Sequence, residues 1–167
     1  MQVTQRQSRL LPLADARALA SREGWREKVL AYITRGNDEL LVFEHTPEYT
    51  SAGIQVPAGG VNVGETPEQA VTREVLEETG LRLNHPVYLV SHEWLNPAPS
   101  RIRHYYWLTV PLNTPDAWQH VVSGGDDDDG MTFLFRFAPI EQPELISSYG
   151  YETALPHLQH LMKENRP

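Results

Sequence analysis

Four glutamates lie close together in the middle of the sequence. Glu65, Glu74, Glu77 and Glu78 fall in the segment GGVNVGETPEQAVTREVLEETGL, which spans residues 59–81. Clustered carboxylates repel one another unless a cation lies among them, and carboxylate oxygens are ligands that hard divalent metals prefer. Metals of this kind bind phosphate oxygens in many enzymes. The segment therefore predicts a metal site that acts on a phosphate compound.

A helix is needed to position these carboxylates, and the segment contains its signals. Thr66 is a good N-cap, Pro67 suits the first helical position, and Gln69 completes a capping box with Thr66. Gly80 suits the left-handed residue that ends a helix. We therefore predict a helix from Pro67 to Thr79.

Three of the glutamates share one face of this predicted helix. Because successive residues advance by about 100°, Glu74 and Glu78 lie one turn apart, and Glu77 flanks them on the same face. Val71 and Val75 border this face and can anchor the helix to a core. Repulsion between like charges one turn apart destabilises a helix by about 0.2–0.5 kcal/mol per pair. A divalent cation bound between the two charges would turn this destabilisation into a stabilisation.

The residues from Gly59 to Leu81 resemble the Nudix box, the motif of the Nudix hydrolase family. The motif reads glycine, five residues, Glu, seven residues, Arg-Glu, an apolar residue, any residue, Glu-Glu, any residue, glycine and an apolar residue, and every specified position matches this sequence. The box covers 23 of the 167 residues, and the flanking strand pattern extends the resemblance more weakly over the rest of the chain.

The resemblance implies an activity and a set of metal ligands. Nudix hydrolases cleave a phosphoanhydride in a nucleoside diphosphate linked to another group, with Mg²⁺ or Mn²⁺ as cofactor and water as nucleophile. By resemblance, Glu74 and Glu78 are the principal metal ligands, and Glu77 is a further ligand or the base that positions the water. The expected partner is therefore a small nucleotide diphosphate derivative.

Other residues of the box would support these ligands. The resemblance implies that Arg73 orients the carboxylates through salt bridges, that Glu65 assists from outside the ligand set, and that a backbone carbonyl of Ala58 or Gly59 completes the metal site. Simpler roles are open as well. Each glutamate taken alone would be an exposed helix charge, Arg73 would be an ordinary partner of Glu77 one turn on, and Glu65 would favour the helix N-terminus.

Composition narrows the class of protein. A chain of 167 residues suits one domain, 1–167, with 40% hydrophobic and 22% charged residues, as in soluble globular proteins. The absence of cysteine excludes disulfides and thiol chemistry. We find neither an apolar run of about 18–20 residues nor a signal-peptide core, and therefore expect a cytoplasmic protein without a membrane partner. The net charge of −8 argues against bulk nucleic-acid binding but not against a nucleotide.

The order of the predicted elements fits the fold that the resemblance implies. From the periodicity of apolar residues we predict strands at 28–34, 39–44, 87–94, 102–110 and 131–137, and further helices at 13–22 and 151–162. A polar loop is expected at 45–51. Strands before and after a central helix, followed by a last helix, suit an α/β (α+β) fold, the Nudix-type αβα sandwich with a mixed β-sheet between helices.

Substrate contacts are expected from residues outside the box. Tyr49 and Trp94 lie in or near predicted loops and are candidates for stacking on a base. Arg101 and Arg103, with His104, follow a proline-rich turn and could contact phosphate or a distal acidic group, the alternative being exposed strand charges. The aromatic run 105–107 is expected to fill the core and the sheet surface.

Two further features bear on the metal and the substrate. The stretch GGDDDDG at 124–130 is either an exposed loop or the source of an additional metal ligand, one of Asp126 to Asp129, since many Nudix enzymes take a ligand from a loop before a late strand. Pro97 lies sixteen residues beyond Leu81, where ADP-ribose-cleaving Nudix enzymes commonly have a proline, and Pro99 is close by. This spacing favours ADP-ribose or a nucleotide sugar as substrate.

Two other functions are compatible with a Nudix fold. The first is a catalytically silent module that binds a nucleotide or a partner, although its intact glutamate set argues against this function. The second is a non-hydrolytic activity like that of isopentenyl diphosphate isomerases, which need a reactive cysteine that this chain lacks. Because several family members are homodimers, the resemblance also leaves a homodimer open.

Overall fold

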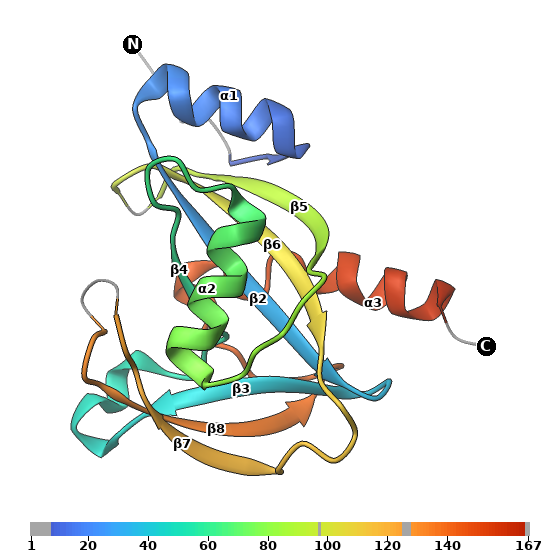
Figure 1. Cartoon of the computed structure of the whole chain (residues 1–167). Coiled ribbons are helices and arrows are strands. Elements are labelled where there is room, and N and C mark those ends of the chain that lie inside the picture. The colour runs from blue at the N-terminus through green and yellow to red at the C-terminus, as the bar shows by residue number, and fades with distance from the viewer. Residues whose placement is uncertain (1–7, 97, 125–127, 166–167) are drawn as a thin grey trace.

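A mixed sheet with helices on both of its faces makes up the part of the chain that the computed structural model describes, residues 8–96, 98–124 and 128–165 (Figure 1). The predicted α/β architecture, a mixed sheet between helices, is confirmed. The helices are α1 (Leu13–Glu23), α2 (Pro67–Thr79) and α3 (Leu155–Glu164), with short 3₁₀-helices η1 (Pro47–Ala52) and η2 (Ser147–Tyr149). The strands are β1 (Leu10–Leu11), β2 (Arg26–Arg35), β3 (Glu39–His45), β4 (Ala58–Gly60), β5 (Val87–Trp94), β6 (Arg101–Thr109), β7 (Ala117–Val121) and β8 (Thr132–Pro139).

Strand β2 is the centre of the sheet, whose order is β1-β5-β6-β2-β3-β8-β7. One edge of β2 pairs in parallel with β6 from Arg26 to Thr34. Its other edge is divided, because β4 pairs with Lys28 to Leu30 and β3 pairs only with Thr34 and Arg35. The divided edge brings β4, and the glycine segment that follows it, beside the middle of the sheet.

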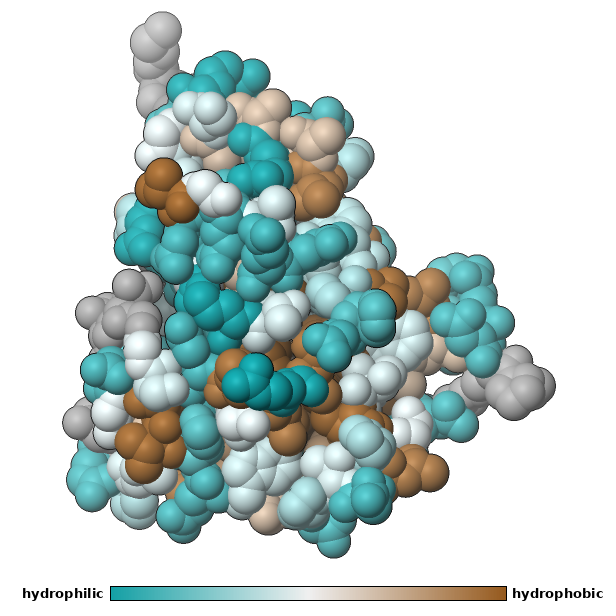
Figure 2. Space-filling model, viewed as in Figure 1, coloured by the Kyte–Doolittle hydropathy of each residue, from teal (hydrophilic) through white to brown (hydrophobic). Residues whose placement is uncertain are grey.

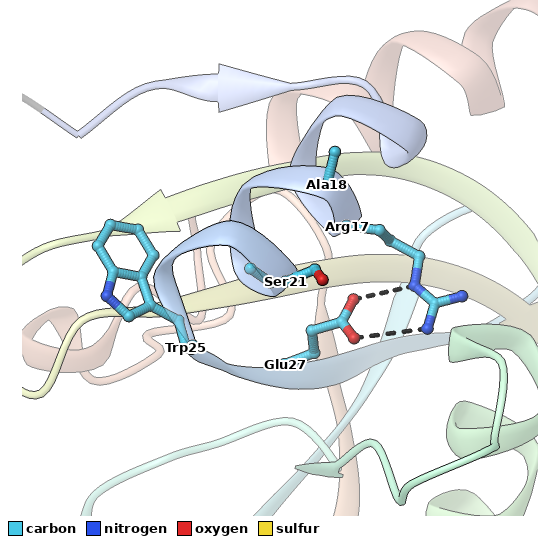
Figure 3. Close-up of a pocket in the computed structure, with 7 residues that line it drawn as sticks. Arg17, Ala18, Ser21, Trp25 and Glu27 are labelled. Carbon is cyan, nitrogen blue, oxygen red and sulfur yellow. Dashed lines mark hydrogen bonds and ion pairs between the residues drawn. The ribbon is translucent and has the colours of Figure 1, made fainter.

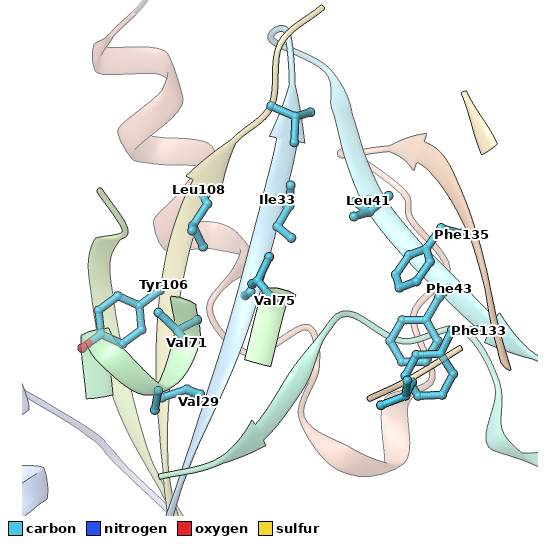
Figure 4. Packing of buried hydrophobic residues seen from close by; sticks show 14 residues of the cluster. Val29, Ile33, Leu41, Phe43, Val71, Val75, Tyr106, Leu108, Phe133 and Phe135 are labelled. Atoms are coloured by element: carbon cyan, nitrogen blue, oxygen red, sulfur yellow. The ribbon is translucent and has the colours of Figure 1, made fainter. Parts of the chain in front are cut away.

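Both faces of β2 are covered by core, which explains its nearly continuous apolar sequence. Val29 and Ile33 belong to a buried cluster that also contains Val71 and Val75 of α2 (Figure 4). Leu30, on the opposite face, belongs to a second cluster that contains residues of α3. The predicted anchoring of α2 by its two valines is confirmed, and Figure 2 shows mainly hydrophilic side chains on the exposed side of this helix.

Helix α2 has the bounds that the sequence predicts, because its signals are local. Thr66 accepts a hydrogen bond from the backbone N–H of Gln69, and the Gln69 side chain accepts one from the Thr66 N–H. Gly80 ends the helix with a left-handed φ of 80°.

The last helix begins later than predicted. Residues 151–154 form turns, and α3 starts at Leu155. Pro156 is the reason, since proline has no N–H to donate to a carbonyl in the preceding turn and is tolerated only in the first turn of a helix. The loop expected at 45–51 contains η1, and strands β1, β4 and β7 were not predicted. Among the described residues, no helix is long and apolar enough to cross a membrane.

Candidate active site on helix α2

Arg73 is the centre of the carboxylate cluster. Its Nε and Nη2 donate to the two carboxylate oxygens of Glu65 at 2.8 and 2.9 Å, and its Nη1 donates to Glu74 at 2.9 Å and to Glu77 at 3.2 Å. Nη2 also donates to the carbonyl of Gly60 at 2.8 Å, which ties β4 to the helix. The bonds with Arg73 lower the pKa of Glu65, and those with Glu65 raise the pKa of Arg73.

Replacing Arg73 by Met is expected to lower both stability and activity. Three partly buried carboxylates would lose their shared cation, so we expect a loss of about 1–3 kcal/mol in the free energy of unfolding. The matched control is Arg136→Met, which breaks the exposed Arg136–Glu44 pair and should cost about 0–1 kcal/mol. Urea unfolding of both variants measures the difference. Equal losses would show that Arg73 is an ordinary surface partner.

Glu74 and Glu78 form a buried pair beside β4. Glu74 is 8% exposed and Glu78 is 3% exposed, and Glu78 accepts a hydrogen bond from the backbone N–H of Ala58 at 3.1 Å. Burial, followed by the charge of Glu74, raises the pKa of Glu78 well above its usual value. Gly59 leaves room for this arrangement, because a Cβ at residue 59 would lie 1.9 Å from the carboxyl carbon of Glu74.

The chemistry of this pair fits a hard divalent cation. Both residues offer carboxylate oxygens, and the repulsion between two buried carboxylates is the condition that a bound cation relieves. In the part of the chain that the structure describes, no three acidic, histidine or cysteine side chains converge as a ready metal-binding group. Glu77 is joined to Arg73, and Gly124 lies against it, since a Cβ at residue 124 would be 3.0 Å from a Glu77 carboxylate oxygen.

A cleft of about 710 Å³ opens beside the carboxylate pair. Its lining consists of Gly24, Trp25, Arg26, Lys28, Ala58, Gly59, Gly60, Pro99, Ser100, Arg101 and Asp128. Of the four aspartates that were candidates for a further ligand, Asp128 lines this cleft, and Asp129 accepts a hydrogen bond from the Gly124 N–H at 3.0 Å. Asp126 and Asp127 lie outside the described residues.

The candidate substrate residues have different surroundings. Arg101 lines the cleft, whereas Arg103 is only 5% exposed, so the alternative of an exposed strand charge is wrong for Arg103. Trp94 is the last residue of β5, as the predicted strand 87–94 implies, and the Arg103 guanidinium lies 4.1 Å from the centre of its ring. Tyr49 lies in η1, but its side chain is outside the described part, as is Pro97.

The remaining candidates near the turn have structural roles. Tyr105 and Tyr106 are buried, as expected, and Trp107 packs against the core beside α3. His104 is buried between Ser91 at 2.6 Å and Glu27 at 2.8 Å. These bonds occupy both of its ring nitrogens, so His104 holds β2, β5 and β6 together and does not face the cleft.

A second hollow, of about 670 Å³, lies beside α1 (Figure 3). Arg17 and Glu27 are its charged residues, and Arg17 Nε donates to Glu27 at 3.1 Å (Figure 3). Because these two charges compensate each other, the hollow offers no excess charge to a ligand. The cleft beside Gly59 differs, since its lining contains Lys28, which is an additional candidate for substrate contact, as is Trp25, which lines both hollows. The sequence alone does not identify them, because their place depends on strand pairing.

Comparison with known protein families gives one match over most of the chain. A family model described as the NUDIX domain matches residues 24–150. The chain is also similar to the NAD-capped RNA hydrolase NudC of Escherichia coli O157:H7 and of Klebsiella pneumoniae, with 44% identity over 63 residues in each case. These alignments cover 38% of this chain and 24% of each relative, so the chain spans about a quarter of the length of the curated relatives it matches.

Comparison with solved structures supports the fold. The pyrophosphohydrolase BsRppH of Bacillus subtilis superimposes with a TM-score of 0.60 and 21% identity, over 98% of this chain and 94% of that one. A NUDIX hydrolase from Nitrosomonas europaea gives a TM-score of 0.57 and 22% identity, over 83% and 90% of the two chains. At these identities the likeness shows a shared fold.

Proposed function

The chain belongs to the NUDIX domain family, whose model matches residues 24–150, and from this membership we propose that it is a hydrolase that uses Mg²⁺ or Mn²⁺ to cleave a phosphoanhydride. The substrate is a nucleoside diphosphate linked to another moiety. The observation that carries the proposal is the buried Glu74–Glu78 pair, held beside a glycine that leaves space for it and next to an open cleft.

The residues of the box divide the work of this reaction. Glu74 and Glu78 would hold the cation, which when bound polarises the diphosphate and lowers the pKa of water. Arg73 keeps Glu65, Glu74 and Glu77 in place through the hydrogen bonds given above. A backbone carbonyl of Ala58 or Gly59 would add a further ligand.

In-line attack by water on one phosphorus requires a base to accept a proton. The candidates are Glu77, Glu78 and a residue of the loop before β8, and Asp128 is the residue of that loop that lines the cleft. The products are a nucleoside monophosphate and a phosphorylated second moiety, or inorganic phosphate. The water oxygen forms a bond to the attacked phosphorus, the bond from that phosphorus to the bridging oxygen breaks, and the protons of the water pass to the base and the leaving group.

The proposed substrate class has two sources of support. The spacing of Pro97 from the box favours ADP-ribose or a nucleotide sugar. The NudC relatives, which match 63 residues of the chain, are NAD-capped RNA hydrolases. They suggest a second kind of substrate, a dinucleotide such as NAD whose two halves are joined through a diphosphate. Both kinds of substrate contain the same nucleoside diphosphate unit. A cytoplasmic location, one domain over 1–167 and a homodimer stay predictions.

Turnover over a panel of substrates tests this proposal. We expect phosphate-containing products from at least one of ADP-ribose, nucleotide sugars, NAD, dinucleoside polyphosphates, coenzyme A and nucleoside triphosphates, with kcat/KM of about 10⁴ M⁻¹s⁻¹ or more. Excess chelator should abolish the activity, and added Mg²⁺ or Mn²⁺ should restore it. Turnover that persists in excess chelator contradicts the metal mechanism. A folded, metal-binding protein that cleaves no member of the panel points to the binding module instead.

A further inference from the structure

Two rows of side chains cross three neighbouring strands at the end of the sheet. In the first row, Arg26 of β2 is paired in register with Arg101 of β6, and Arg101 with Trp94 of β5. In the second row, Lys28 is paired with Arg103, and Arg103 with His92. Register partners point to the same face of a sheet, as do residues two apart on one strand. All six side chains therefore lie on one face.

Four of these residues form what we call the cationic cluster: Arg26, Lys28, Arg101 and Arg103. Burial, and after it the charges of Arg101 and Arg103, lower the pKa of Lys28. Asp128, which lines the cleft with Lys28, opposes this effect. A chain with a net charge of −8 thus gathers cations at one point, although like charges repel one another there.

Arg103 is the most deeply buried residue of this cluster. It is 5% exposed, and among the described residues its buried Nε and Nη1 have no hydrogen-bond partner. Its neighbours are the ring of Trp94 and the hydroxyl of Tyr105, which are neutral. Arg35, which is buried to a similar degree, pairs instead with Glu39 at 2.8 Å and Asp116 at 2.9 Å.

A buried guanidinium without a carboxylate is costly, because arginine stays protonated at all ordinary pH values. Proteins keep such a destabilising charge at functional sites, where the binding of a ligand compensates it. A guanidinium is a planar group of charged N–H donors, and groups of this kind bind phosphate oxygens well. The Trp94 ring, whose centre lies 4.1 Å from the Arg103 guanidinium carbon, restricts the movement of this group.

The cationic cluster adjoins the carboxylate pair. Lys28 is the register partner of Gly60, and Lys28, Arg101 and Gly59 line the same cleft. Gly59 in turn lies against Glu74. A substrate held at the carboxylates would therefore reach the cluster with its next phosphate.

We propose that Lys28, Arg101 and Arg103 form a phosphate subsite beside the carboxylate pair, with Arg103 as its buried anchor. The proposal rests on the proposed function, because it supplies the second point of attachment for a diphosphate substrate. It assigns phosphate recognition to the chain itself, in addition to any metal. The subsite should therefore bind a phosphate compound when no divalent metal is present.

Inorganic pyrophosphate, titrated in the presence of chelator and followed by calorimetry, tests the subsite. Wild-type protein should bind it, and Arg103→Gln and Lys28→Gln should weaken binding by about 10–100-fold, as for the loss of charge-assisted hydrogen bonds. Arg136→Gln is the matched control, an exposed arginine on β8 that pairs with Glu44, and should bind as wild type does.

A melting curve separates binding from a structural role. Arg103→Gln removes a buried charge that pairs with no carboxylate in the described part of the chain, so it should melt at or above the wild-type temperature. A lower melting temperature together with unchanged pyrophosphate binding overturns the proposal, as does an absence of binding by the wild-type protein.

The outcome is distinguishable from that of the proposed function. If pyrophosphate binds and Arg103→Gln abolishes binding while no panel substrate is cleaved, the subsite stands and the hydrolase proposal fails. If hydrolysis is found and Arg103→Gln leaves KM and pyrophosphate binding unchanged, the subsite fails and the hydrolase proposal stands.

Discussion

Glu78→Gln is expected to lower kcat by about 10²-fold or more while leaving the fold intact. Glutamine has nearly the shape of glutamate, so the buried position next to Ala58 stays filled, but its neutral amide is a poor ligand for a divalent cation. The loss should appear in kcat at saturating Mg²⁺ or Mn²⁺.

The metal-free stability of this variant gives an independent check. The pKa of Glu78 is raised in the folded protein, by burial and then by the charge of Glu74, so the native state holds this proton more tightly than the unfolded chain does. The resulting contribution to stability is present below the unfolded-state pKa and is lost as pH rises toward the folded-state value. At neutral pH in chelator, Glu78→Gln should therefore melt at or above the wild-type temperature.

Glu68→Gln is the matched control for Glu78→Gln, because Glu68 is an exposed residue in the first turn of the same helix. It should change neither kcat nor the metal dependence of activity. Full activity of Glu78→Gln would sink the assignment of Glu78 as a metal ligand, and a collapse of its fold would show that the carboxylate is structural.

Gly59→Ala is expected to reduce activity by about 10–100-fold with a smaller effect on the fold. The added methyl group would lie 1.9 Å from the Glu74 carboxyl carbon, so the side chain of Glu74 must move out of its place. Because Glu74 is one of the two proposed principal ligands, its displacement should weaken metal binding. Activity measured against Mg²⁺ concentration should therefore show a raised requirement for the metal.

Gly64→Ala provides the contrasting control. Gly64 has a left-handed φ of 80°, and a Cβ there would meet no atom within 4 Å. Its replacement should cost about 1 kcal/mol of stability through backbone strain, without a change in metal requirement. If Gly59→Ala keeps both wild-type activity and wild-type metal dependence, the position of Glu74 is not needed for the reaction.

Local signals explain what the sequence predicts well. The capping box at Thr66, the proline at the first helical position and Gly80 define α2 within one continuous segment, and the same segment contains all four glutamates. Neighbours in sequence are then neighbours in space, so the spacing of Arg73, Glu74 and Glu78 is informative before any tertiary contact is known.

Long-range pairing explains what the sequence does not predict. The location of Lys28 beside Arg103 depends on the parallel register of β2 with β6, which joins residues 75 positions apart, 103 less 28. The contact of Trp94 with the Arg103 guanidinium likewise depends on the antiparallel register of β5 with β6. Strand β7 escapes notice because its five residues, AWQHV, are half-buried at the sheet edge and too few to show a clear pattern.

The divided edge of β2 has a consequence for how this site can be altered. The carboxylates of the site belong to helix α2, in the short stretch that follows β4. The cations of the site belong to two separate strands, β2 and β6. Residues at 28, 101 and 103 can therefore be exchanged in combination, as in a selection for new substrates, while residues 59–80 are kept constant. Catalytic power and substrate preference would then be inherited from different parts of the chain, which makes this protein a suitable scaffold for directed evolution of specificity.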